Sequence, residues 1–131
     1  MYAHDVIVLP FETSTPAIAR TRLAAFLTVN LASPSVIDDA LIVISEMIAN
    51  AVSHGSPTPD GGIEISWSIH GDLLELSVLD AGACTSLTPI DFDEDSLSGR
   101  GLSIISRVAD RWWVDMSQGT RVNAELHLTP R

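Results

Sequence analysis

A carboxylate, a carboxamide and an imidazole recur at four-residue intervals in the most apolar stretch of the sequence, as Glu46, Asn50 and His54. On an α-helix a four-residue step stays on nearly the same face, so the three side chains would form one polar stripe on an otherwise apolar helix. An asparagine oxygen suits Mg²⁺, and a carboxylate one turn away could orient or deprotonate a hydroxyl or water near that metal. The alternative is that all three face solvent, with His54 as a favourable cation at the helix end.

A second carboxylate stands at the end of a predicted strand, in Asp80-Ala81-Gly82. Its oxygens could accept a hydrogen bond from an exocyclic amine, while the glycine would let a flat ring approach the backbone. The simpler alternative is an ordinary Asp-x-Gly turn.

Two glycines flank an arginine just before a predicted helix, in Gly99-Arg100-Gly101-Leu102. Glycines leave backbone N–H groups accessible to phosphate, the helix N-terminus adds a favourable dipole, and arginine adds a charged fork. By itself this motif is weak, because glycines often precede helices. Gly119-Thr120, between the last two predicted strands, taken alone indicates a hairpin turn.

Helical periodicity shows which elements must position these groups. Twice, a proline that follows a hydroxyl residue marks a helix start, so we expect helices over about 16–31 and 35–54. Gly55 is the expected C-terminal glycine of the second helix. A third helix is expected from about 102 to 109.

Alternation of apolar and polar residues predicts strands over about 63–69 and 74–80, joined by a turn. Shorter runs predict strands over 5–9, 112–116 and 122–128, the first of them at a sheet edge because a proline ends it. We therefore expect the α+β fold class, a two-layer α/β sandwich in which helices lie on one face of a mixed, mostly antiparallel sheet.

The stretch 81–98 has no clear period and contains an acidic run over 91–95. A structureless loop of this length inside a compact domain is usually a functional lid or disordered. The acidic run is most simply a solvated face, and it could not itself surround a triphosphate because like charges repel.

Composition narrows the class of protein. The 131 residues fit a single domain, and the net charge of −10 argues against nucleic-acid binding and disfavours anionic membrane surfaces. One cysteine, Cys84, excludes an intramolecular disulfide and fits a reducing compartment. Neither a signal peptide nor an apolar run of about 20 residues is seen, so we expect a cytoplasmic domain without direct nucleic-acid or membrane contact.

Taken together, the motifs resemble those of the GHKL ATPase superfamily in their order and spacing. Glu-x-x-x-Asn-Ala-x-x-His-Gly on a helix is followed by Asp-x-Gly, then Gly-x-Gly-Leu, then Gly-Thr. The short chain looks most like the anti-sigma factor serine kinases of the SpoIIAB/RsbW type. The resemblance covers about residues 5–128 and implies a Bergerat ATP-binding fold that is one histidine-kinase-like ATPase domain over 1–131, with a lid at about 81–100.

This resemblance implies roles for individual residues, with ATP and Mg²⁺ as cofactors. Asn50 would bind the metal, and Glu46 would activate the attacking hydroxyl. Asp80 would bind the adenine amine, with Gly82 behind the ring and Thr120 assisting.

Four consecutive residues would hold the phosphates and close the lid: Gly99, Arg100, Gly101 and Leu102. The resemblance further implies a sigma factor as one protein partner and, as the other, a STAS-domain antagonist whose serine is phosphorylated. It also implies a homodimer.

Two positions depart from the family pattern. Cys84 stands where a second glycine is common, as a small structural residue or as a redox-sensing thiol. Leu97 stands where these kinases often carry an arginine.

Phosphoryl transfer depends on neutralising the charge of the moving phosphoryl group, so Leu97 and the acidic lid favour a nucleotide-gated regulator without kinase activity. Glu46 favours the kinase, because binding alone would not require its carboxylate. The intact motifs argue against a third possibility, a domain that has lost nucleotide binding.

Overall fold

The computed structural model describes residues 2–82 and 99–129. Its elements are β1 (Tyr2–Pro10), α1 (Thr15–Val29), α2 (Pro34–His54), β2 (Gly62–His70), β3 (Leu73–Asp80), α3 (Gly99–Val108), β4 (Arg111–Asp115) and β5 (Thr120–His127). Their order and types are those expected from the sequence. Cys84, Leu97 and the acidic run lie outside the described residues.

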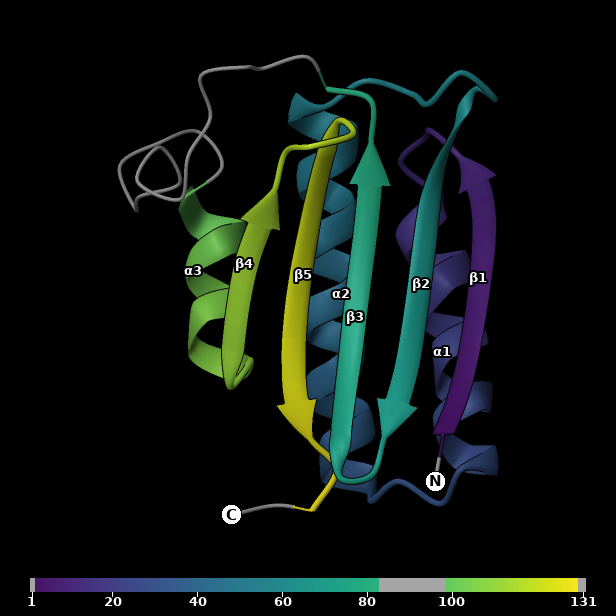
Figure 1. Ribbon diagram of the computed structural model, residues 1–131, viewed down its shortest axis with the longest axis vertical. Coiled ribbons are helices and arrows are strands. Elements are labelled where there is room, and N and C mark those ends of the chain that lie inside the picture. The colour runs from purple at the N-terminus through teal and green to yellow at the C-terminus, as the bar shows by residue number, and fades with distance from the viewer. Residues whose placement is uncertain (1, 83–98, 130–131) are drawn as a thin grey trace.

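The described strands form one sheet in the order β1-β2-β3-β5-β4, and each described pairing is antiparallel. The helices lie on one side of this sheet, which leaves the other face open (Figure 1). The expected α+β class is therefore confirmed, with a fully antiparallel sheet among these strands. β1 is an edge strand, as predicted from its terminal proline.

Period-two alternation decides which side chains enter the core. On β2 the side chains that face the helices are fully or almost fully buried: Ile63, Ile65, Trp67 and Ile69. The register sets Trp67 opposite Leu76 of β3, and Leu76 opposite Ala124 of β5. Burying a large apolar side chain contributes about 1.5–3 kcal/mol, so this layer supplies much of the stability that holds the helices in place.

α1 ends earlier than predicted, whereas α2 ends where predicted but with a different backbone conformation at its C-terminal glycine. α1 stops at Val29, two residues early, because Leu31 adopts a left-handed backbone with φ of 64°. α2 ends before Gly55 as predicted, but Gly55 has φ of −97° and ψ of −162°, which is extended and open to any residue. A left-handed cap therefore does not explain this glycine.

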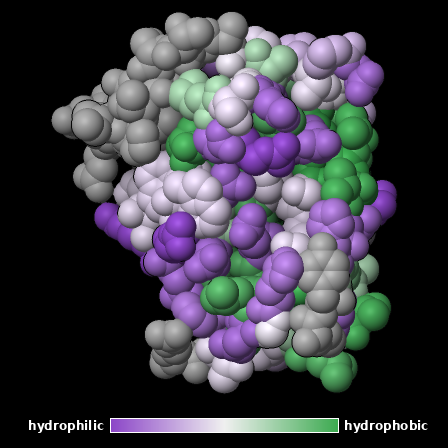
Figure 2. Space-filling view, in the orientation of Figure 1, coloured by the Kyte–Doolittle hydropathy of each residue, from purple (hydrophilic) through white to green (hydrophobic). Residues whose placement is uncertain are grey.

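The open face of the sheet carries many hydrophilic side chains, with an apolar strip along its β1 edge that includes the exposed Val6 and Val8 (Figure 2). There Arg121 forms an ion pair with Glu64 at 3.1 Å and donates a hydrogen bond to Ser77 at 2.8 Å. The guanidinium carbon of Arg111 lies over the ring of Trp113, 4.5 Å from its centroid.

Within the described ranges, none of the helices is both long and apolar enough to cross a bilayer.

Candidate functional site

The four sequence motifs lie at one end of the molecule (Figure 1). The C-terminus of α2, the end of β3 and the start of β5 meet there, and α3 begins to one side of them. Antiparallel pairing sets Asp80 directly opposite Thr120, and α2 packs against β3, β5 and α3. Segments up to about 70 residues apart in sequence are thus brought to a single site.

Asp80 is buried although it carries a carboxyl group, with 4% of its surface exposed. Its Oδ1 accepts hydrogen bonds from the backbone N–H groups of Gly82 at 2.5 Å and Ser56 at 3.3 Å. No described residue donates to Oδ2. One carboxylate oxygen is therefore bound by the protein, and the other can accept a hydrogen bond from a ligand.

Thr120 acts on this site through Gly82. Its Oγ1 donates a hydrogen bond to the carbonyl oxygen of Gly82 at 3.2 Å, and Thr120 is itself buried. This bond fixes the backbone segment that in turn donates to Asp80. A direct contact between Thr120 and a ligand stays a prediction.

Three glycines surround Asp80. An ideal Cβ on Gly82 would lie 2.5 Å from Asp80 Oδ1, and one on Gly55 would lie 2.5 Å from Asp80 Cγ. A Cβ on Gly119, which has φ of +104°, would likewise lie too close to the backbone of Asp80. The sequence singled out Gly82 for a ligand role but missed this role for Gly55 and Gly119. Both glycines belong to the sequence motifs, which was the available signal, but only the fold shows that Gly55 packs against the carboxylate of Asp80 and Gly119 against its backbone.

Burial raises the pKa of Asp80 above its usual range, and the hydrogen bonds from Gly82 and Ser56 lower it only in part. When the pKa of a group is higher in the folded protein than in the unfolded chain, the group contributes stability that is fully present at pH values below the unfolded-state pKa. That contribution is lost as the pH rises through the folded-state pKa. Ionised Asp80 therefore destabilises the fold at neutral pH, which is typical of a functional rather than a structural carboxylate.

We expect Asp80→Asn to be more stable than the wild type at pH 7, because the amide keeps an acceptor oxygen for Gly82 and Ser56 but has no charge to desolvate. The difference should shrink at a pH below about 3.9, where aspartate is protonated in the unfolded chain. Urea unfolding at pH 7 and pH 3.5 measures both values. A variant that is destabilised equally at the two pH values would contradict this account.

The polar stripe lies on α2 as predicted. Asn50 is half-buried, and its buried Nδ2 has no hydrogen-bond partner among the described residues. Glu46 is half-buried and makes no hydrogen bond or ion pair with any described residue, while His54 is exposed at the helix end. A buried amide group without a partner costs about 1–3 kcal/mol. Within the described part of the chain, the Asn50 carboxamide therefore leaves one hydrogen-bond donor unsatisfied.

Gly99, Arg100, Gly101 and Leu102 form the first turn of α3. The predicted start at Leu102 is therefore three residues late, and the glycines belong to the helix. The first N–H groups of a helix have no partner within it, so this turn can bind an anion. The side chains of these four residues are outside the described part of the chain, and their roles stay predictions.

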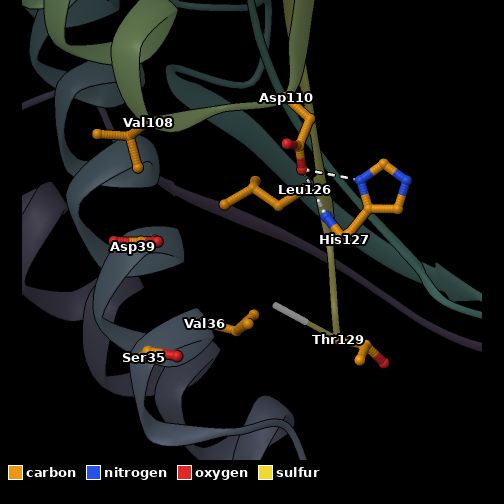
Figure 3. A pocket seen from close by; sticks show the side chains of 8 residues that line it. All are labelled: Ser35, Val36, Asp39, Val108, Asp110, Leu126, His127 and Thr129. Carbon is orange, nitrogen blue, oxygen red and sulfur yellow. Dashed lines mark hydrogen bonds and ion pairs between the residues drawn. The ribbon is translucent and has the colours of Figure 1, made fainter. Parts of the chain in front are cut away.

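A cavity of about 230 Å³ lies at the opposite end of α2, between that helix, the end of α3 and the end of β5 (Figure 3). Its lining includes Asp39 and Asp110, and Asp110 Oδ2 lies 2.9 Å from Nδ1 of His127. None of the four motifs contributes to it. Its two aspartates would repel phosphate, so it does not compete with the Asp80 end as a nucleotide site.

Two comparisons with known proteins bear on the family and the fold of this chain. A family model described as histidine kinase-like ATPase domain matches residues 9–126. Among solved structures, the chain is similar to the RsbU and RsbW domains of Rv1364c from Mycobacterium tuberculosis, with a TM-score of 0.69 and 23% sequence identity. The match covers 95% of this chain and 32% of that one, so the chain spans about a third of the length of its structural relative. No curated protein matches the chain. Since the family model covers most of the sequence, the chain belongs to the histidine kinase-like ATPase domain family.

Proposed function

We propose that this protein is an ATP-binding anti-sigma factor that phosphorylates a serine of a STAS-domain antagonist. The observation that carries the proposal is Asp80, a buried carboxylate with Oδ1 bound by the backbone and Oδ2 without a described donor. Adenine presents an amino group beside a flat ring, which suits one acceptor oxygen next to Gly82. Guanine presents a carbonyl acceptor at that position, and the carboxylate would repel it.

The residues present also fit magnesium. Asn50 offers a neutral oxygen, and no described residue accepts a hydrogen bond from its buried Nδ2, which leaves the carboxamide available for a ligand. Mg²⁺ is usually bound by one or two protein oxygens together with phosphates and waters, which suits a single asparagine. When bound, Mg-ATP supplies the transferable phosphoryl group, and the first turn of α3 is where this chain would hold the phosphates.

Glu46 is the proposed general base. It lies one helical turn before Asn50 on the same face of α2, and no described residue occupies its carboxylate. A half-buried carboxylate at that place can accept the proton of a serine hydroxyl as the hydroxyl attacks. Leu97, where related kinases often carry an arginine, supports the second candidate, a nucleotide-gated regulator that binds its partners without phosphorylating them.

The proposed partners rest on the likeness to an RsbW domain and on charge. A net charge of −10 complements the basic surface with which a sigma factor binds DNA. We propose a homodimer as the working form. Binding that does not weaken with added salt would count against the electrostatic part of this proposal.

The deciding experiment is a pull-down from the native cell with and without Mg-ATP, with partners identified by mass spectrometry. Labelled ATP is then added to each captured complex. Label on a serine of a STAS-domain protein supports the kinase. Nucleotide-dependent capture of both partners without transfer supports the second candidate, and a wild-type protein that fails to bind ATP contradicts both.

A further inference from the structure

The C-terminal end of α2 lies directly against the carboxylate of Asp80. The N–H of Gly55 closes the last turn by donating to the carbonyl of Ala51 at 2.7 Å. The next N–H, that of Ser56, donates to Asp80 Oδ1 at 3.3 Å, and the carbonyl of Ser56 accepts from Ala81 at 2.9 Å. One hydrogen bond to the side chain of Asp80 and one between backbone groups therefore join the end of the helix to the end of β3.

Gly55 is required here by space and not by its backbone angles, which are extended. A Cβ at this position would lie 2.5 Å from Asp80 Cγ and 2.7 Å from the carbonyl oxygen of Ala51. The carboxylate cannot simply move aside, because its Oδ1 also accepts the 2.5 Å hydrogen bond from Gly82. A side chain on residue 55 would therefore rotate the carboxylate or displace the helix end.

We propose that Gly55 and the backbone N–H of Ser56 are positioning groups for nucleotide recognition, which hold Oδ1 of Asp80 against α2 so that only Oδ2 faces the base. This inference rests on the proposed function and deepens it. A carboxylate held in one orientation presents one acceptor in one direction. Such preorganisation strengthens binding, because the ligand does not have to order the group.

The same contact links the base-binding carboxylate to the metal-binding carboxamide. Asn50 precedes Gly55 by five residues on α2, which is a rise of about 7.5 Å along a rigid helix. The helix end therefore sets the distance between Asp80 and Asn50. A change at Gly55 should affect recognition of the base first, because Asn50 lies more than one turn inside the helix.

The test compares Mg-ATP with the Mg-triphosphate of purine riboside, which lacks the 6-amino group, by titration calorimetry. We expect the wild type to prefer ATP. Gly55→Ala should weaken ATP binding about tenfold, because the hydrogen bond from the 6-amino group to the charged carboxylate of Asp80 is lost. Binding of the analogue should change less than about twofold, because it never makes that bond. The preference for ATP should therefore nearly disappear. Ser53→Ala, an exposed position on the same turn, should behave as wild type.

A second variant, Ser56→Pro, removes the N–H without adding a Cβ at residue 55. The extended backbone of Gly55 is compatible with a following proline. We expect the same selective loss of ATP affinity. In the ligand-free protein, a titration of the Asp80 carboxyl by ¹³C NMR should give a higher pKa than in wild type, because a hydrogen bond to the charged form is lost.

The outcomes separate this inference from the proposed function. If the wild type binds ATP but neither variant alters its selectivity, the positioning role is wrong and ATP binding stands. Equal losses for ATP and the analogue would show a merely structural effect and also overturn the inference. An unchanged Asp80 titration in Ser56→Pro would overturn it even for a protein that binds no ATP.

Discussion

Replacing Asn50 with alanine is expected to weaken Mg-ATP binding at least a hundredfold, about 2.7 kcal/mol, because the metal loses its proposed protein ligand. The stability of the fold should change much less than the affinity for Mg-ATP. Nδ2 of Asn50 is buried and no described residue accepts a hydrogen bond from it, so its removal relieves a desolvated donor. We expect the free energy of unfolding to stay within about 1 kcal/mol of wild type, since an unpaired buried group contributes no hydrogen bond to lose.

Calorimetry with Mg-ATP and urea unfolding measure the two quantities. Ser53→Ala is the matched control, because it lies three residues further along α2, is exposed and makes no described hydrogen bond. A large loss of stability with unchanged ATP affinity would show that Asn50 has a structural role. Unchanged affinity alone would refute its assignment as the metal ligand.

Replacing Glu46 with glutamine should abolish transfer while preserving binding. Loss of a general base usually lowers the rate of a reaction by about a hundred- to ten-thousandfold. ATP affinity should be unchanged or slightly higher, because a carboxylate near a triphosphate is repulsive. Glutamine keeps the shape of the side chain, so the effect reports the lost proton acceptor.

The measurement is labelled phosphate transferred to the captured STAS-domain partner, at ATP concentrations above the affinity measured for each variant. Glu75→Gln is the control, since Glu75 is a half-exposed carboxylate on β3, outside all four motifs. Transfer by Glu46→Gln at the wild-type rate would exclude Glu46 as the base. Strong loss of ATP binding would instead place its carboxylate in the binding site.

The two variants together separate nucleotide-dependent partner binding from phosphoryl transfer. A kinase requires both Glu46 and Asn50, whereas a nucleotide-gated regulator requires Asn50 alone. Release or capture of the partner by ATP should therefore survive Glu46→Gln under either candidate. It should fail in Asn50→Ala under both.

The sequence was enough to predict the elements, their order and the fold class. Helix and strand periods are local properties, so the stripe of Glu46, Asn50 and His54 on α2 followed from spacing alone. The alternation on β2 likewise predicted which of its side chains are buried. The end of α1 was predicted two residues too late, because Leu31 takes a left-handed backbone that no local pattern of apolar residues indicates.

The motifs were visible in the sequence, but how they act on one another was not. Asp80 was a candidate from its place at a strand end, and Thr120 from the resemblance to a family. That the hydroxyl of Thr120 binds Gly82 follows only from the register that pairs β3 with β5.

The environment of Asp80 was decided by the tertiary structure. Gly55 looked like an ordinary helix terminator, yet it is extended, and its missing Cβ makes room for a carboxylate 25 residues later in the chain. Ser56 contributes a backbone N–H, a group that every residue except proline carries and that no sequence pattern can single out. The sequence by itself determined which residues are the candidates for the chemistry. Packing of α2 against the sheet decided which oxygen of Asp80 remains for a ligand, because that depends on contacts between segments distant in sequence.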